Sequence, residues 1–226
     1  MTGQPAAVDN PALCHANVLE QPKGSPVSTR DEVLARIRRH PPAAVALPEL
    51  PAFARGERAA RGSFDDFAAA LQRMGGKVAP PPAGGDVAAA VRALFPDAGV
   101  VCSAAPEVAG NLALSAVREP RELADVDVGI VRAAFGVAET GSVLLTEADL
   151  GVEALGFLAQ HLVVLLDPTC IVPTLHDGYR DAAFANARYA IFMTGPSATA
   201  DIEGVLIHGA QGIRSLTLLP CAIASG

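Results

Sequence analysis

Tryptophan is missing from this sequence of 226 residues, and aromatic residues together make up only 4% of it. Lysine is nearly missing too: it occurs only at Lys23 and Lys77, and the formal net charge is −7. Most of such a surface repels a phosphate backbone, which argues against a nucleic-acid partner. The one dense basic run, residues 36–40, lies at the end of an expected helix, where the helix dipole favours cations.

Closely spaced cysteines are also missing. Cys14, Cys102, Cys170 and Cys221 lie far apart, and no C-x-x-C pair occurs. Iron–sulfur clusters and structural zinc sites usually draw on closely spaced ligands. We therefore expect this chain alone to bind no cofactor and no metal. In a reducing compartment such cysteines are usually small buried hydrophobes.

Long apolar runs are absent as well. The run at residues 162–166 is far shorter than the roughly 18 residues that a membrane-spanning helix needs. Residues 1–10 show no basic segment followed by an apolar block, which a secretory signal would have. A P-loop, a G-x-G-x-x-G fingerprint and a G-x-S-x-G elbow are all missing. The sequence predicts a cytoplasmic protein without a membrane span.

The residues that are present suffice for one large domain. Half of them are apolar, which allows a sizeable core. We expect residues 1–27, rich in proline, glycine and small polar residues, to form a flexible N-terminal segment. Residues 28–226 are predicted to be a single domain that opens with a helix and a connector over residues 28–62. The T-x-x-E pattern from Thr29 to Glu32 is typical of a helix start.

Predicted helices and strands alternate from residue 63 onward. Helices are expected at residues 63–74, 86–95 and 174–187, and strands at 77–79, 99–102, 126–131, 142–146, 161–166, 189–193, 204–208 and 215–219. The strand at 161–166 is almost continuously apolar, as in strands buried on both faces. This rhythm predicts an α/β fold in which helices cover a parallel sheet.

The first candidate site segment is Ala138–Ser142, which joins two expected strands. Glu139 is followed by Thr140 and Gly141, and a glycine lets a ligand approach the backbone closely. A carboxylate held there can act as a nucleophile, a base or a hydrogen-bond acceptor. An ordinary turn with Glu139 in water explains the same pattern.

The second segment, Thr194–Glu203, follows a strand and begins with a glycine-proline turn. It contains the candidates Gly195, Ser197, Thr199, Asp201 and Glu203. With nearby backbone N–H groups, the hydroxyls can cradle an anion or another polar ligand. Alternatively, the two carboxylates cap a short helix, order the loop or bind a cation.

The third segment contains Gly209, Gln211, Gly212 and Arg214. Two glycines three residues apart suggest a tight loop beside a ligand, and Arg214 can hold a carboxylate through two hydrogen bonds. A plain turn is the alternative.

Two of these segments resemble a known family. Ala138–Ser142 resembles the A-E-T-G-[ST] motif of the lactate-utilisation (LUD) family, and Gly195–Glu203 resembles its G-P-S-x-T-A-D-I-E motif. In its short length and its lack of cysteine motifs, the chain is similar to the C-type members of this family. The resemblance implies a three-layer α/β/α Rossmann-like fold, similar to the ribose-phosphate isomerase and CoA-transferase group.

The resemblance also implies a function. The chain would be a non-cluster component of an iron–sulfur complex that oxidises L-lactate to pyruvate, beside lactate-utilisation proteins A and B, which would hold the clusters. Glu139 and Asp201 would then be the catalytic candidates. The ligand-binding candidates would be Thr140, Gly141, Gly195, Ser197, Thr199, Glu203, Gly209, Gln211, Gly212 and Arg214.

The third segment departs from the family's G-V-H-G-P-[RK] pattern. Gln211 replaces the histidine and Ile213 replaces the proline. Glutamine donates and accepts hydrogen bonds but does not titrate, which weakens any mechanism with proton transfer at this loop. Two other hypotheses stay open: an enzyme that uses Glu139 as a nucleophile on acyl-CoA, by analogy with CoA transferases, and a regulator that binds a small carboxylate near Arg214.

Overall fold

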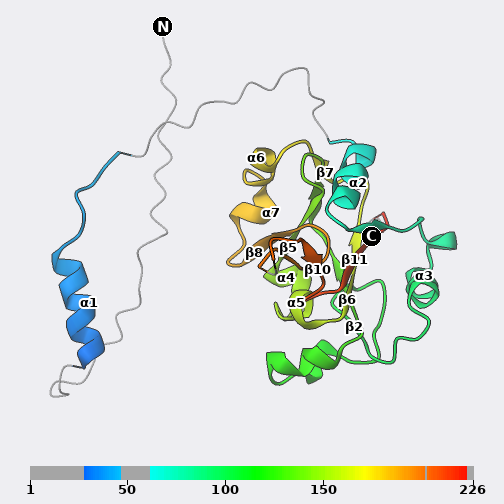
Figure 1. Ribbon diagram of the computed structural model, residues 1–226, viewed down its shortest axis with the longest axis horizontal. Coiled ribbons are helices and arrows are strands. Elements are labelled where there is room, and N and C mark those ends of the chain that lie inside the picture. The colour runs from blue at the N-terminus through cyan, green and yellow to red at the C-terminus, as the bar shows by residue number, and fades with distance from the viewer. Residues whose placement is uncertain (1–27, 47–61, 202, 223–226) are drawn as a thin grey trace, which may run out of the picture. The chain divides into compact units, whose positions relative to one another are not determined.

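The computed structural model describes residues 28–46, 62–201 and 203–222 (Figure 1). The chain divides into two compact units, Met1–Ala54 and Arg55–Gly226. The predicted flexible segment, residues 1–27, lies outside the described residues.

The first unit contains helix α1 (Thr29–Arg39). Ser28 caps it: its hydroxyl oxygen accepts the N–H of Asp31 at 3.2 Å, and the Asp31 carboxylate accepts the N–H of Ser28 at 3.3 Å. The predicted capping pair Thr29 and Glu32 is therefore wrong by one residue. An S-x-x-D pattern satisfies the same two backbone groups, because aspartate reaches back as glutamate does.

A five-stranded parallel sheet lies at the centre of the second unit, in the order β1-β11-β6-β3-β2. Its strands are β1 (Lys77–Val78), β2 (Val101–Ser103), β3 (Val128–Arg132), β6 (His161–Leu166) and β11 (Ser215–Pro220). The apolar β6 is in the middle, paired on both sides. The predicted α/β fold with a parallel sheet is confirmed.

Helices cover both faces of this sheet (Figure 1). On one face, α3 (Val87–Leu94) contributes Val87 and Val91 to a core shared with Ile130 and Val163. On the other face, Phe67 and Leu71 of α2 (Phe64–Arg73) belong to the larger core, which also contains Val131 and Val164. Successive side chains of β3 and β6 thus belong to two different cores, because side chains along a strand point to alternate faces of the sheet.

A second sheet, in the order β7-β4-β5-β8, adds a layer that the sequence did not predict. Its strands are β4 (Phe135–Val137), β5 (Ser142–Thr146), β7 (Ile171–Val172) and β8 (Ala190–Met193). Strand β5 is antiparallel to both β4 and β8. The predicted strands at 142–146 and 189–193 exist, but they belong here and not to the central sheet.

Short elements complete the fold. They are α4 (Glu147–Leu150), α5 (Leu155–Leu158), α6 (Leu175–Gly178), α7 (Ala182–Ala185), η1 (Ala83–Gly85), η2 (Leu114–Ala116), η3 (Pro120–Asp125), β9 (Ala198–Thr199) and β10 (Ile207–His208). The predicted helix 174–187 is interrupted: α6 and α7 both lie in this range, but the chain turns after Gly178, and the Asp181 carboxylate starts α7 by accepting the N–H of Ala183. Within the described parts of the chain, no helix has the length and apolar character needed to cross a membrane.

Candidate functional site

The turn at Ala138–Ser142 packs between two helices. Gly141, at φ 68°, is so close to α2 that a Cβ atom on it would lie 2.1 Å from the Leu71 nitrogen. Glu139 is exposed, and its Oε2 accepts the N–H of Leu175, the first residue of α6, at 3.1 Å. The turn therefore connects α2 to α6, and the Glu139 carboxylate is engaged at a helix start.

Three hydroxyl groups link this turn to the second segment. The Thr140 hydroxyl donates to Ser142 Oγ at 2.8 Å, and Ser142 Oγ is hydrogen-bonded to Thr194 Oγ1. Ser142 is only 6% exposed, so its hydroxyl depends on these partners. Thr194 directly follows β8 and opens the second segment, so the first two motifs meet at this residue.

The second and third segments are also joined by hydrogen bonds. The N–H of Ser197 donates to the Ile213 carbonyl at 3.0 Å, and the Ser197 hydroxyl donates to the Gln211 carbonyl. In the opposite direction, the N–H of Gly209 donates to the Ser197 carbonyl. Ser197 thereby ties the loop before β11 to the end of β8.

A pocket of about 240 Å³ lies among these loops and α5, and we call it the motif pocket. Its lining residues are Gly156, Phe157, Met193, Thr194, Gly195, Pro196, Ser197, Gln211, Gly212 and Ile213. Gly195, Ser197, Gln211 and Gly212 were predicted ligand-binding residues, whereas Thr194 and Phe157 were missed. Because none of these lining side chains titrates, the pocket offers hydrogen bonds and apolar contact but no general base.

The other predicted residues of the second segment lie elsewhere. Thr199 and Asp201 bond to each other, with Oγ1 and Oδ2 3.0 Å apart, and the hairpin β9–β10 carries them. Asp201 and Glu203 are both exposed, and Glu203 has a φ of 54°. A short helix capped by these carboxylates was one alternative, and the observed hairpin contradicts it. Among the described residues, no group of three or more His, Cys, Asp or Glu side chains is placed to hold a metal ion.

Arg214 lines a different pocket, of about 320 Å³, which we call the amino-edge pocket. It lies where β3, β6 and β11 begin, and its lining residues are Leu94, Phe95, Pro96, Asp97, Ala98, Asp127, Val128, Gln160, His161 and Arg214. Open α/β sheets usually place their ligand sites beyond the carboxyl ends of the parallel strands. Both described pockets instead border the loop that enters β11.

His161, the first residue of β6, lines the amino-edge pocket. Its Nδ1 is 2.8 Å from Ser215 Oγ, and its ring lies 5.0 Å from the Phe95 ring, measured between centroids. Burial, followed by the positive charges of Arg214 and Lys77, lowers the pKa of His161. One sequence signal could have found it: a histidine at the first position of an otherwise apolar strand.

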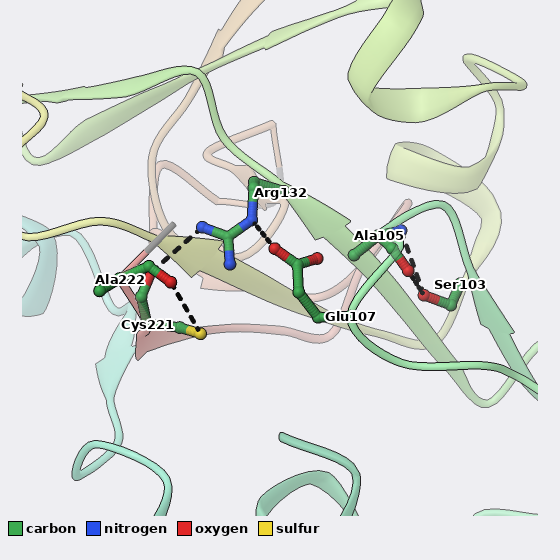
Figure 2. Close-up of polar contacts among 6 residues, drawn as sticks. All are labelled: Ser103, Ala105, Glu107, Arg132, Cys221 and Ala222. Atoms are coloured by element: carbon green, nitrogen blue, oxygen red, sulfur yellow. Dashed lines mark hydrogen bonds and ion pairs between the residues drawn. The ribbon is translucent and has the colours of Figure 1, made fainter. Parts of the chain in front are cut away.

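The carboxyl edge of the parallel sheet carries an ion pair that the sequence also did not reveal (Figure 2). Arg132, at the end of β3, donates from Nε to the Glu107 carboxylate and from Nη1 to the Cys221 carbonyl at 3.1 Å. Its Nη2 is buried without a hydrogen-bond partner among the described residues. Cys102 is buried on β2, the strand that pairs with β3, and burial raises its pKa, as expected for a cysteine that packs as a hydrophobe.

Comparisons with known proteins agree with the motifs. Residues 113–219 match the LUD domain family. Lactate utilization protein C from Deinococcus radiodurans is 31% identical over 101 residues, which are 43% of this chain and 48% of that protein. The match thus spans about half the length of that curated relative.

A solved structure shares the fold. A DUF162 family protein from Deinococcus radiodurans superposes with a TM-score of 0.56 and 20% sequence identity, over 70% of this chain and 95% of that one. The family match covers both motifs and the loops that form the motif pocket. Over residues 113–219, which are just under half of the chain, the sequence is thus similar to the LUD domain family.

Proposed function

We propose that this protein takes part in lactate utilisation, as a non-cluster component of an iron–sulfur complex that oxidises L-lactate to pyruvate. The observation that carries the proposal is the likeness to lactate utilization protein C, together with the LUD match over residues 113–219. The geometry supports a binding role, because the family motifs converge on Thr194 and Ser197 beside one pocket.

The cysteines and other possible metal ligands of the described residues are consistent with a component that holds no iron–sulfur cluster itself. Cys102, Cys170 and Cys221 are free, and the described residues contain no cluster of metal-ligating side chains. A lactate oxidation needs an electron acceptor, so the proposal assigns electron transfer to iron–sulfur partner proteins. Val205 and Leu206, 60% and 59% exposed beside the β9–β10 hairpin, give an apolar contact for such a partner.

The CoA-transferase alternative finds less support. Its nucleophile would be Glu139, whose carboxylate caps α6 by accepting the Leu175 N–H. Glu139 lines neither the motif pocket nor the amino-edge pocket.

Growth on L-lactate as sole carbon source tests the proposal. A deletion strain should fail on lactate and grow on glucose, and the native gene should rescue it. Ser197→Ala and Thr194→Val should rescue poorly, because each removes a hydroxyl that orders the motif pocket. Thr199→Ala, which changes a hydroxyl outside that pocket, should rescue fully. Normal growth of the deletion strain on lactate, with no second lactate oxidase present, would refute the role.

A further inference from the structure

We propose that the amino-edge pocket binds a small carboxylate, with the Arg214 guanidinium on the carboxylate group and the His161 ring on a neighbouring oxygen of the ligand. The proposal deepens the proposed function, on which the choice of lactate and pyruvate as ligands rests, because it adds a carboxylate site separate from the motif pocket. It is also separate from the carboxyl edge, where such folds usually bind their ligands.

Arg214 is available for an anion. It is exposed and, among the described residues, its side chain forms no hydrogen bond or ion pair. Its position is nonetheless defined, because its backbone N–H donates to the Gln160 carbonyl at 2.7 Å. A guanidinium fork matches the two oxygens of a carboxylate better than any other side chain does.

His161 supplies the second polar contact. Its Nδ1 pairs with Ser215 Oγ at 2.8 Å and its ring lies against Phe95, so two neighbours fix the orientation of the imidazole. Its other nitrogen, Nε2, has no hydrogen-bond partner within the described chain. A hydroxyl or carbonyl oxygen next to a carboxylate suits this nitrogen, which selects 2-hydroxy or 2-oxo acids over plain fatty acids.

The acidic residues of the pocket do not cancel its attraction for an anion. Asp127 Oδ2 accepts the N–H groups of Gly99 and Val100, each at 2.8 Å, and these bonds lower the pKa of the Asp127 carboxyl. Its charge is thus compensated by the backbone. Asp97 is exposed at the rim, where solvent screens it.

The volume limits the ligand to a small molecule. About 320 Å³ is at the lower end of the range for small-molecule sites. The charged or polar groups around the His161 ring are Ser215 from β11, Asp127 from the start of β3, and the cations Arg214 and Lys77. A bound carboxylate offsets these cations, so binding should favour the imidazolium form and become tighter as the pH falls.

Titration of the full chain tests the site. Sodium L-lactate, sodium pyruvate, sodium acetate and inorganic phosphate would be added in separate calorimetric titrations at constant ionic strength. We expect saturable binding of lactate or pyruvate, weaker binding of acetate, and still weaker binding of phosphate. Arg214→Gln should weaken the affinity at least about tenfold. Arg188→Gln, a change in a side chain that is 94% exposed, should leave it unchanged.

A spectroscopic readout separates binding at this pocket from binding elsewhere. Proton NMR of the histidine rings, with His161→Gln for assignment, should show the His161 pKa rise when the carboxylate binds. No saturable binding by any carboxylate, phosphate binding more tightly than lactate and pyruvate, or equal affinity in the Arg214→Gln chain would each overturn the proposal. These binding results are independent of growth on lactate, so the two proposals can fail separately.

Discussion

Gly141 lies against the backbone of Leu71, and a Cβ atom on it would meet the Leu71 nitrogen at 2.1 Å. The A-E-T-G turn needs its glycine for this approach to α2, as well as for a φ of 68°. The glycine thus has a packing role that can be tested without any ligand.

Gly141→Ala should destabilise the fold by about 3 kcal/mol, because left-handed strain and overpacking add together. Urea unfolding of the native chain and of Gly141→Ala measures this difference in the free energy of unfolding. Gly84→Ala is the matched control: Gly84 has a similar φ of 61°, but no atom lies within 4 Å of its added Cβ. Gly84→Ala should therefore lower the free energy of unfolding by only about 1 kcal/mol. Equal losses in the two variants would contradict the close packing on α2.

Glu139→Gln should preserve both stability and growth on lactate. The amide oxygen of glutamine still accepts the Leu175 N–H, which is the contact seen for Glu139. Glu139→Ala removes the acceptor and should lower the free energy of unfolding by less than about 1 kcal/mol. A normally folded Glu139→Gln chain that cannot support growth would instead show that the ionised carboxylate takes part in the chemistry.

Stability should fall as the pH drops below 6.5, and His161 should account for part of the fall. The folded chain lowers the pKa of His161 from an ordinary value of 6.5, chiefly through burial. The unfolded chain therefore binds more protons just below pH 6.5, so acid favours unfolding there. Urea midpoints measured between pH 5 and 7.5 should show a shallower slope for His161→Gln than for the native chain. A slope for His161→Gln equal to that of the native chain would contradict this role of His161.

Arg132 and Glu107 should behave as a coupled pair. Their side chains are 15% and 21% exposed, so removing one partner leaves a largely buried charge. Arg132→Met should cost about 2–3 kcal/mol of unfolding free energy, and adding Glu107→Leu should recover part of that loss. A double-mutant cycle by urea unfolding gives the coupling energy. Strictly additive losses would mean that the pair seen in Figure 2 contributes nothing to stability.

The strands with the strongest apolar patterns were predictable from the sequence. The expected ranges 142–146 and 161–166 coincide with β5 and β6, since both are rich in buried Val and Leu. Helix starts were predictable where a small hydroxyl residue leads, as at Ser63, whose Oγ accepts the N–H groups of Asp65 and Asp66. These signals are local, so one sequence suffices to detect them.

The partition of strands between two sheets was not predictable. Strand β5 has the composition of a central parallel strand, yet it pairs antiparallel with β4 and β8. Only the tertiary pairing decides this, and a pattern of side chains does not encode it. The short strands β4 and β7 were missed for the same reason, because two or three residues show no periodicity.

The candidate site was predictable as a set of loops but not as a set of contacts. The motifs pointed to Ser197, Gln211 and Gly212, which do meet in the motif pocket. They pointed equally to Asp201 and Glu203, which are exposed near the β9–β10 hairpin. Residue type at a given spacing shows which groups are chemically able to act, whereas the sheet order decides which of them meet.

Ile213 and Arg214 are neighbours in the chain but line different pockets, Ile213 the motif pocket and Arg214 the amino-edge pocket. A single peptide unit therefore forms part of the wall between two cavities, held by Ser197 on one side and by Gln160 on the other. A ligand that shifted this unit in one cavity would change the shape of the other. Any resulting effect of one occupant on the affinity for the other would be reciprocal, by the same factor.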